Sequence, residues 1–218
     1  MKTILLFGST GLIGGELLRL LLEDSNAMVK AFLRRPIVIT NIPPHFTQHV
    51  VDFNRIEEWK NLLAGDELYC CLGTTIRKAG SRAAFRAVDY ELVLQIANRA
   101  LVNGVKKFIV ISSLGADAGS SNFYLRTKGE MERDVQQLLF QKIRILRPSV
   151  LTGNRDEFRL GEKVGIGVAS VLSPLMVGRL KKYKPISATS VARAMITLAG
   201  TEDVQVVYES DELQMMGK

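Results

Sequence analysis

Short apolar segments alternate with longer amphipathic segments along almost the whole chain. The short segments have the length of buried strands, and the longer ones repeat their apolar residues at helical spacing. The predicted strands are Thr3–Phe7, Val29–Leu33, Thr47–Val51, Glu67–Leu72, Lys107–Ser112, Lys142–Leu146 and Val204–Tyr208. The predicted helices are Leu12–Glu23, Ile56–Leu63, Arg82–Asn103, Phe123–Phe140 and Thr189–Leu198. This alternation favours βαβ units, and therefore a doubly wound parallel sheet of the α/β class.

We expect a single domain over residues 1–218, because no repeat, low-complexity tract or linker divides the chain. Residues 151–185 have the weakest pattern and follow the sixth predicted strand, where a doubly wound sheet places a loop that covers the substrate cleft. The apolar stretch 164–180 fits a packed helix or lid better than a membrane contact, and a surface for a partner stays open. Neither an export signal nor a membrane-spanning segment is expected.

Glycines recur at every third position directly after the first predicted strand, at Gly8, Gly11 and Gly14. The first allows a tight turn, the second a close approach of the backbone to a pyrophosphate, and the third close packing of helix on strand. An anion would then lie on free N–H groups at the start of the helix. The alternative is an ordinary strand-to-helix turn. The predicted dinucleotide-binding residues of this turn are Gly8, Ser9, Thr10, Gly11, Leu12, Ile13 and Gly14.

The ends of the second and third predicted strands suggest which dinucleotide binds. Arg34 and Arg35 follow the second strand, where an NAD site usually has an acidic residue. A guanidinium suits the 2′-phosphate of NADP, so we predict NADP(H), although two surface arginines are the simpler alternative. Asp52 and Phe53 follow the third strand and are candidates for the adenine edge, with a solvated carboxylate as the alternative.

A serine pair and a Tyr-x-x-x-Lys motif follow the fifth predicted strand. Ser112 and Ser113 end that strand, and Tyr124 and Lys128 lie four residues apart on one face of the next predicted helix. The ammonium of Lys128 would favour ionisation of the phenol and make it a usable proton donor near neutrality. A nearby serine hydroxyl could bind the oxygen of a reacting carbonyl. We therefore name Ser113, Tyr124 and Lys128 as candidate catalytic residues.

Together these motifs resemble the short-chain dehydrogenase/reductase superfamily with a Rossmann fold, and more narrowly its atypical members. Three blocks carry the resemblance most specifically: CCLGTTIRKAGSRAAFRAVD, VISSLGADAGSSNFYLRTKGEME and LRPSVLTGNRDE. The resemblance implies that Tyr124 is the catalytic acid/base, that Lys128 holds the nicotinamide ribose, and that Ser113 orients the carbonyl, with Ser112 as the alternative. It also implies further cofactor contacts at Leu72, Gly73, Thr74, Pro148 and Leu151.

The chain departs from the superfamily pattern in two places. Asp89 stands near the position where many members have an asparagine that organises the proton relay. The asparagine-containing turn after the fourth strand is replaced by Cys70-Cys71-Leu72-Gly73. Both departures concern proton transfer and neither disturbs cofactor binding. Arg155 lies where the substrate cleft should open, and could contact a ligand or a neighbouring carboxylate.

Composition narrows the remaining function classes. The net charge of +7 comes from scattered basic residues without a nucleic-acid motif, and it suits an anionic cofactor better than a nucleic acid. The adjacent Cys70 and Cys71 would point to opposite faces of a strand, so we expect free, buried thiols in a reducing cytoplasm. His45 and His49 lack a third ligand, so no metal site is expected.

The leading hypothesis is an NADP-dependent carbonyl reductase that acts on a small molecule. The alternative is an NADP-binding regulatory or scaffold protein without significant turnover. An isomerase or epimerase with tightly held cofactor fits less well, because the region after the sixth strand is short for nucleotide-sugar binding. The sequence does not identify the substrate, and it leaves a homodimer or a protein partner open.

Overall fold

A seven-stranded parallel sheet forms the centre of the computed structural model, which describes residues 1–152 and 178–218. The strand order is β3-β2-β1-β4-β5-β6-β9, so the chain starts in the middle and winds outward in both directions. The strands are β1 (Lys2–Phe7), β2 (Ala27–Leu33), β3 (Phe46–Val50), β4 (Glu67–Cys70), β5 (Lys107–Ile111), β6 (Lys142–Arg147) and β9 (Val207–Glu209). The expected doubly wound α/β fold is confirmed.

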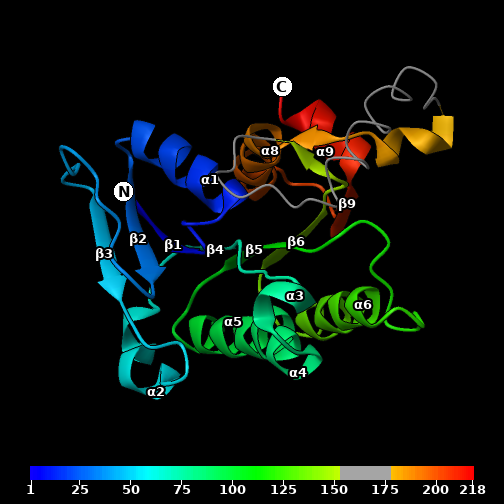
Figure 1. Cartoon of the computed structure of the whole chain (residues 1–218). Coiled ribbons are helices and arrows are strands. Elements are labelled where there is room, and N and C mark those ends of the chain that lie inside the picture. Colours follow the sequence, from blue (N-terminus) through cyan, green and yellow to red (C-terminus); the bar gives the residue numbers. More distant parts are fainter. Residues whose placement is uncertain (153–177) are drawn as a thin grey trace.

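Helices cover both faces of the sheet (Figure 1). One face packs against α1 (Leu12–Glu23), α8 (Ala188–Gly200) and α9 (Ser210–Met216), and α1 contacts α8 directly. The other face packs against α2, α5 and α6. The bounds on that side are α2 (Ile56–Trp59), the 3-10 turn η1 (Lys60–Leu62), α3 (Ile76–Ala79), α4 (Arg82–Arg86), the π-helical segment η2 (Ala87–Glu91), α5 (Leu92–Val102) and α6 (Phe123–Val135).

Every predicted strand and helix is present, with differences at the ends. The helix predicted over Arg82–Asn103 is continuous but includes the π-helical segment Ala87–Glu91. The helix predicted to reach Phe140 ends at Val135. Helix α9 was not predicted, although the sequence contains its capping box, in which Glu209 and Glu212 bind each other's backbone N–H groups.

A small parallel pair of strands, β7 (Leu151–Thr152) and β8 (Ile186–Ser187), joins the two described parts of the chain, and η4 (Gly178–Tyr183) precedes β8. The expected cleft-covering region is described only at its ends. Arg155 and residues 164–177 lie outside the described residues, so the expectations for them stay untested. Within the described ranges, no helix is long and apolar enough to cross a membrane.

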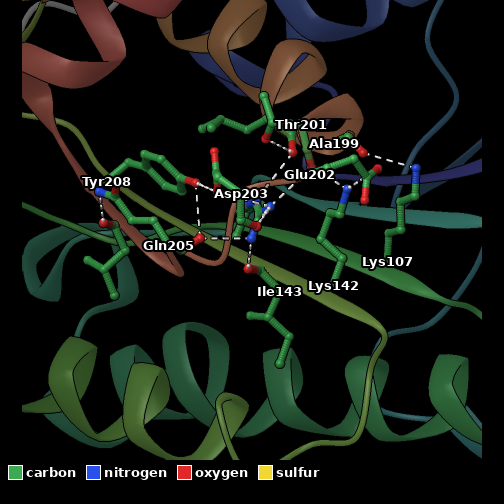
Figure 2. Close-up of polar contacts among 12 residues, drawn as sticks. Lys107, Lys142, Ile143, Ala199, Thr201, Glu202, Asp203, Gln205 and Tyr208 are labelled. Atoms are coloured by element: carbon green, nitrogen blue, oxygen red, sulfur yellow. Dashed lines mark hydrogen bonds and ion pairs between the residues drawn. The ribbon is translucent and has the colours of Figure 1, made fainter.

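The amino ends of the strands are closed by a polar network around the connection from α8 to β9 (Figure 2). Arg144 is 3% exposed and donates to the carbonyl oxygens of Gln205 at 2.7 Å and Asp203 at 2.8 Å. Lys107 donates to the carbonyl oxygen of Ala199 at 2.9 Å, and Lys142 binds the carboxylate of Glu202 at 3.1 Å. These basic residues therefore hold the C-terminal helix layer on the sheet.

Candidate functional site

The glycine turn lies at the carboxyl end of β1, in the middle of the sheet. Gly8 has φ +80°, and a Cβ atom there would lie 2.5 Å from the carbonyl oxygen of Cys71. A Cβ atom at Gly14 would lie 2.1 Å from the carbonyl oxygen of Gly8. Real Cβ contacts are never that short, so both positions require glycine. The predicted roles of Gly8 in the tight turn and of Gly14 in close helix–strand packing are confirmed.

The start of α1 lies directly above this turn. Gly11 is the N-cap residue, and no side chain caps the helix. The Ser9 hydroxyl is buried and has no hydrogen-bond partner among the described residues. Unused N–H groups at a helix start carry partial positive charge and bind phosphate well. The uncapped helix, the glycine cradle and the free Ser9 hydroxyl therefore fit the pyrophosphate of a dinucleotide.

Arg34 and Arg35 follow β2 at the same edge, and both are exposed. In the part of the chain that the structure describes, neither guanidinium forms an ion pair. No acidic residue occupies the turn that they form. Both guanidinium groups are therefore available to an anion, and their binding of a 2′-phosphate stays a prediction.

Asp52 and Phe53 follow β3, and the surrounding turn uses both residues. One carboxylate oxygen of Asp52 accepts hydrogen bonds from the backbone N–H of Asn54 at 2.9 Å and from its side-chain amide at 3.1 Å. The Phe53 ring packs against Phe7 and Trp59, with both centroid distances at 6.0 Å. These contacts give the two residues a structural role, and their contact with adenine stays a prediction.

Lys128 projects from α6 to the carboxyl end of β4, where it meets Asp89. The Nζ atom lies 2.8 Å from one carboxylate oxygen of Asp89, and the other oxygen accepts the backbone N–H of Thr74 at 2.8 Å. Lys128 is 3% exposed and Asp89 is fully buried. Burial alone lowers the pKa of Lys128, but the charge of Asp89, with that of an ionised Tyr124, raises it above the usual value. The lysine is therefore held in its charged form.

Tyr124 lies one turn before Lys128 on α6, which begins after Asn122. The side-chain oxygen of Asn122 accepts the N–H groups of Tyr124 and Leu125, so the helix start is capped. The half-buried phenol ring packs against the buried ring of Phe85, with centroids 5.3 Å apart. Phe85 was not predicted as a site residue. Phe85 lies four residues before Asp89 in a predicted helix, so both side chains were expected on the same helix face. This spacing could have indicated Phe85 as a site residue.

The serine pair lies between β5 and a turn. The Ser112 hydroxyl is buried without a partner among the described residues, and Ser113 is half-buried with a weak 3.5 Å contact to the Leu114 carbonyl. Pro148 follows β6 and accepts the N–H of Leu114 at 3.1 Å, while Leu151 pairs with Ile186 in the small sheet. The predicted nicotinamide-side residues therefore lie at one edge. Which serine contacts a substrate stays a prediction.

The two cysteines lie on opposite faces of the sheet and are both free, as expected. Burial raises the pKa of the Cys70 thiol to about 11 and that of Cys71 well above its usual value. They are therefore neutral packing residues near pH 7. Across residues 1–152 and 178–218 no cluster of three or more His, Cys, Asp or Glu side chains could hold a metal ion.

Comparison with known proteins agrees with this geometry. The model of the NAD(P)H-binding family matches residues 8–202. Protein HTATIP2 of Rattus norvegicus is 39% identical over 164 residues, which cover 74% of this chain and 67% of the rat protein. The mitochondrial protein FMP52 of Coccidioides immitis is 31% identical over 220 residues, which cover 93% of this chain and 89% of the fungal protein.

Solved structures share the fold at low sequence identity. The UDP-glucose 4-epimerase of Thermotoga maritima superposes with a TM-score of 0.71 at 16% identity, covering 95% of this chain and 76% of the epimerase. MoeE5 in complex with UDP-glucose and NAD gives a TM-score of 0.68 at 16% identity, covering 99% and 80%. The chain belongs to the NAD(P)H-binding family, and within it is an atypical short-chain dehydrogenase/reductase similar to HTATIP2.

Proposed function

We propose that the protein is an NADP-dependent oxidoreductase of the carbonyl reductase type that acts on a small carbonyl compound. The observation that carries this proposal is the position of Tyr124 and Lys128. Both lie on one face of α6, and Lys128 is buried beside the loop that follows β4, at the same sheet edge as the glycine turn. A proton donor and a fixed positive charge therefore adjoin a dinucleotide site.

The residues at this edge fit a nicotinamide dinucleotide. The glycine turn from Gly8 to Gly14 would hold the pyrophosphate, Arg34 and Arg35 the 2′-phosphate, and Lys128 the nicotinamide ribose. The loop from Leu72 to Thr74 and the backbone from Pro148 to Leu151 would complete the binding surface. When bound, this group supplies or accepts the hydride.

The chain's own residues would handle the proton. In the reductive direction, the Tyr124 hydroxyl donates its proton to the carbonyl oxygen, and the resulting phenolate is stabilised by the charge of Lys128. Ser113 would hold the carbonyl oxygen in place, with Ser112 as the alternative. The buried ring of Phe85 packs against one side of the phenol ring and limits its movement.

Two variants at this site test the proposal. Tyr124→Phe should bind NADPH as the wild type does but lose turnover across a panel of aldehydes and ketones, because only the hydroxyl is removed. Lys128→Ala should lose turnover and should also bind NADPH more weakly than the wild type. Turnover retained by Tyr124→Phe would show that another group donates the proton.

A regulatory NADP-binding protein is the second candidate. The observation that favours it is the Asp89–Lys128 ion pair, because Asp89 already binds the ammonium group that would otherwise stabilise a Tyr124 phenolate. Such a protein would lose NADPH affinity on Lys128→Ala and would show no turnover on any carbonyl. Wild-type turnover that disappears in Tyr124→Phe would exclude this candidate.

We propose the cytoplasm as the compartment, on the ground of the two free thiols, although fungal relatives are named mitochondrial. Cell fractionation with antibody detection would test this proposal, and recovery with mitochondria would overturn it. No nucleic-acid partner is proposed. A homodimer or protein partner would be found by measuring the solution mass.

A further inference from the structure

We propose that Asp89 is a positioning residue, which holds Lys128 in its charged form and ties it to the Gly73–Thr74 turn. The consequence is that dinucleotide binding at this edge keeps its strength from neutral to alkaline pH. The inference rests on the proposed function only as far as a nicotinamide dinucleotide binds beside Lys128. It requires no turnover.

Both charged groups of the Asp89–Lys128 pair are buried. Asp89 is fully buried and Lys128 is 3% exposed, and their charged atoms lie 2.8 Å apart. A lysine buried to this degree without a counter-charge loses its proton easily, because the charged form is the one that desolvation penalises. Lys128 therefore depends on a neighbouring negative charge.

Three groups on the surrounding elements face Lys128: Asp89 of η2, Tyr124 of α6 and Cys70 of β4. Burial raises the pKa of the Cys70 thiol to about 11, so it is neutral over the range where a dinucleotide would be bound. The Tyr124 side chain is half-buried, whereas the Asp89 carboxylate is fully buried 2.8 Å from Lys128 Nζ. Asp89 is therefore the group that supplies the counter-charge.

The second oxygen of Asp89 reaches a different element. It accepts the backbone N–H of Thr74 at 2.8 Å, in the turn between β4 and α3. A Cβ atom at Gly73 would lie 3.4 Å from Asp89 Oδ1 and 3.8 Å from Lys128 Nζ, so this turn passes directly over the ion pair. One carboxylate thus joins the turn to α6.

The backbone around Asp89 is itself unusual. Asp89 is the central residue of the π-helical segment Ala87–Glu91, where the N–H of Leu92 bonds to the carbonyl of Ala87, five residues earlier. Such segments interrupt α-helices frequently at functional sites. Here the segment places an acidic side chain in the buried interior rather than at the helix surface.

The test compares NADPH affinity at pH 7.0 and pH 9.5 in the full chain, by calorimetry. Both values lie above the ionisation of the cofactor's own 2′-phosphate, near pH 6. Wild type should change by less than about threefold. Asp89→Asn keeps the side-chain shape but removes the charge, so its affinity should fall by about tenfold or more between the two pH values.

Asp134→Asn is the matched control, because Asp134 lies on α6, the helix of Lys128, but accepts a hydrogen bond from the Tyr90 hydroxyl at 2.7 Å. It should follow the wild type. A merely structural role for Asp89 would lower the unfolding temperature of Asp89→Asn but give it the wild-type pH slope, and that slope would overturn the proposal. Absence of NADPH binding to wild type would overturn the proposed function together with this inference, whereas absence of turnover alone would leave the inference standing.

A second measurement is made on the wild-type protein and does not require Asp89→Asn to fold. Carbon-13 NMR of the lysine Cε atoms, with Lys128 assigned by its loss in Lys128→Arg, should show Lys128 protonated through pH 10. Titration of Lys128 below pH 9 would overturn the proposal.

Discussion

The amino-end edge of the sheet and its carboxyl-end edge both contain buried charged side chains, and they differ in how completely their polar atoms are paired. At the amino-end edge, the carboxylate of Glu67 binds Lys2 at 3.1 Å, Lys107 at 3.2 Å and the Tyr69 hydroxyl at 3.0 Å. Arg144 donates to several backbone carbonyls and pairs with Asp203 at 3.2 Å.

At the carboxyl-end edge, polar groups are left free among the described residues. The Ser9 and Ser112 hydroxyls are buried without partners, α1 has no side-chain cap, and Arg34 forms no ion pair. A buried polar group without a partner costs about 1–3 kcal/mol. Buried hydroxyls without partners cluster at the carboxyl-end edge, where we propose that a ligand binds. The amino-end edge has its buried charges paired and stabilises the fold.

The largest predicted change is a loss of stability caused by a substitution at the amino-end edge. Arg144→Met removes a guanidinium that is 3% exposed and leaves its carbonyl partners unpaired, so the free energy of unfolding should fall by about 3–5 kcal/mol. Urea denaturation measures this change, and NADPH affinity of the folded variant should stay at the wild-type value. Arg19→Met, in an exposed pair with Glu23, is the control and should change stability by less than about 0.5 kcal/mol. A comparable loss in both variants would contradict the structural role.

The next largest predicted change is a loss of NADPH affinity caused by a substitution at the carboxyl-end edge. In Gly14→Ala the new Cβ would lie 2.1 Å from the Gly8 carbonyl oxygen, so the turn must move and NADPH affinity should fall by about a hundredfold or more. Gly15→Ala is a close control, because its Cβ would lie 3.5 Å from the Ser9 carbonyl oxygen, an ordinary contact. That control should keep its affinity and gain about 0.5–1 kcal/mol of stability as a helix-interior alanine. Equal affinities in the two variants would remove the turn from the site.

A smaller effect is expected from Arg34→Ala. Losing a charge-assisted contact to the 2′-phosphate should cost about 1.5–3 kcal/mol, or one to two decades in NADPH affinity, and should leave NADH affinity unchanged. Parallel titrations of both cofactors measure it, with Arg19→Ala as the control for net charge. If wild type binds NADH as tightly as NADPH, the proposed preference is wrong.

The smallest effect on stability concerns His49 of β3, which stacks on Phe32 of β2. Burial, and then the charge of Lys30, lower its pKa below 6.5 in the folded protein. The unfolded chain therefore takes up the proton first as pH falls below 6.5, and stability should decrease there. Because the ring is partly exposed, the loss should be less than about 1 kcal/mol. Urea midpoints at pH 7.5 and 5.0 should differ less in His49→Phe than in wild type, and equal differences would contradict this assignment.

The sequence was sufficient to predict the backbone geometry at the carboxyl ends of the strands, where short motifs determine it. The spacing of Gly8, Gly11 and Gly14 after a strand, and of Tyr124 and Lys128 on a helix, reports backbone geometry directly. Asp89 was noted only as a departure from a pattern, because its contact with Lys128 depends on a π-helical segment that residue periodicity does not reveal. The contacts of Arg144 depend on carbonyls about 60 residues away, which no local pattern encodes.

Calorimetric titration of NADPH into the wild-type protein shows whether the carboxyl-end edge binds a dinucleotide. We predict saturable binding of one NADPH per chain, at least about tenfold tighter than NADH, with a matching rise in unfolding temperature. Absence of saturable binding by either dinucleotide would contradict the assignment of the carboxyl-end edge as the functional edge.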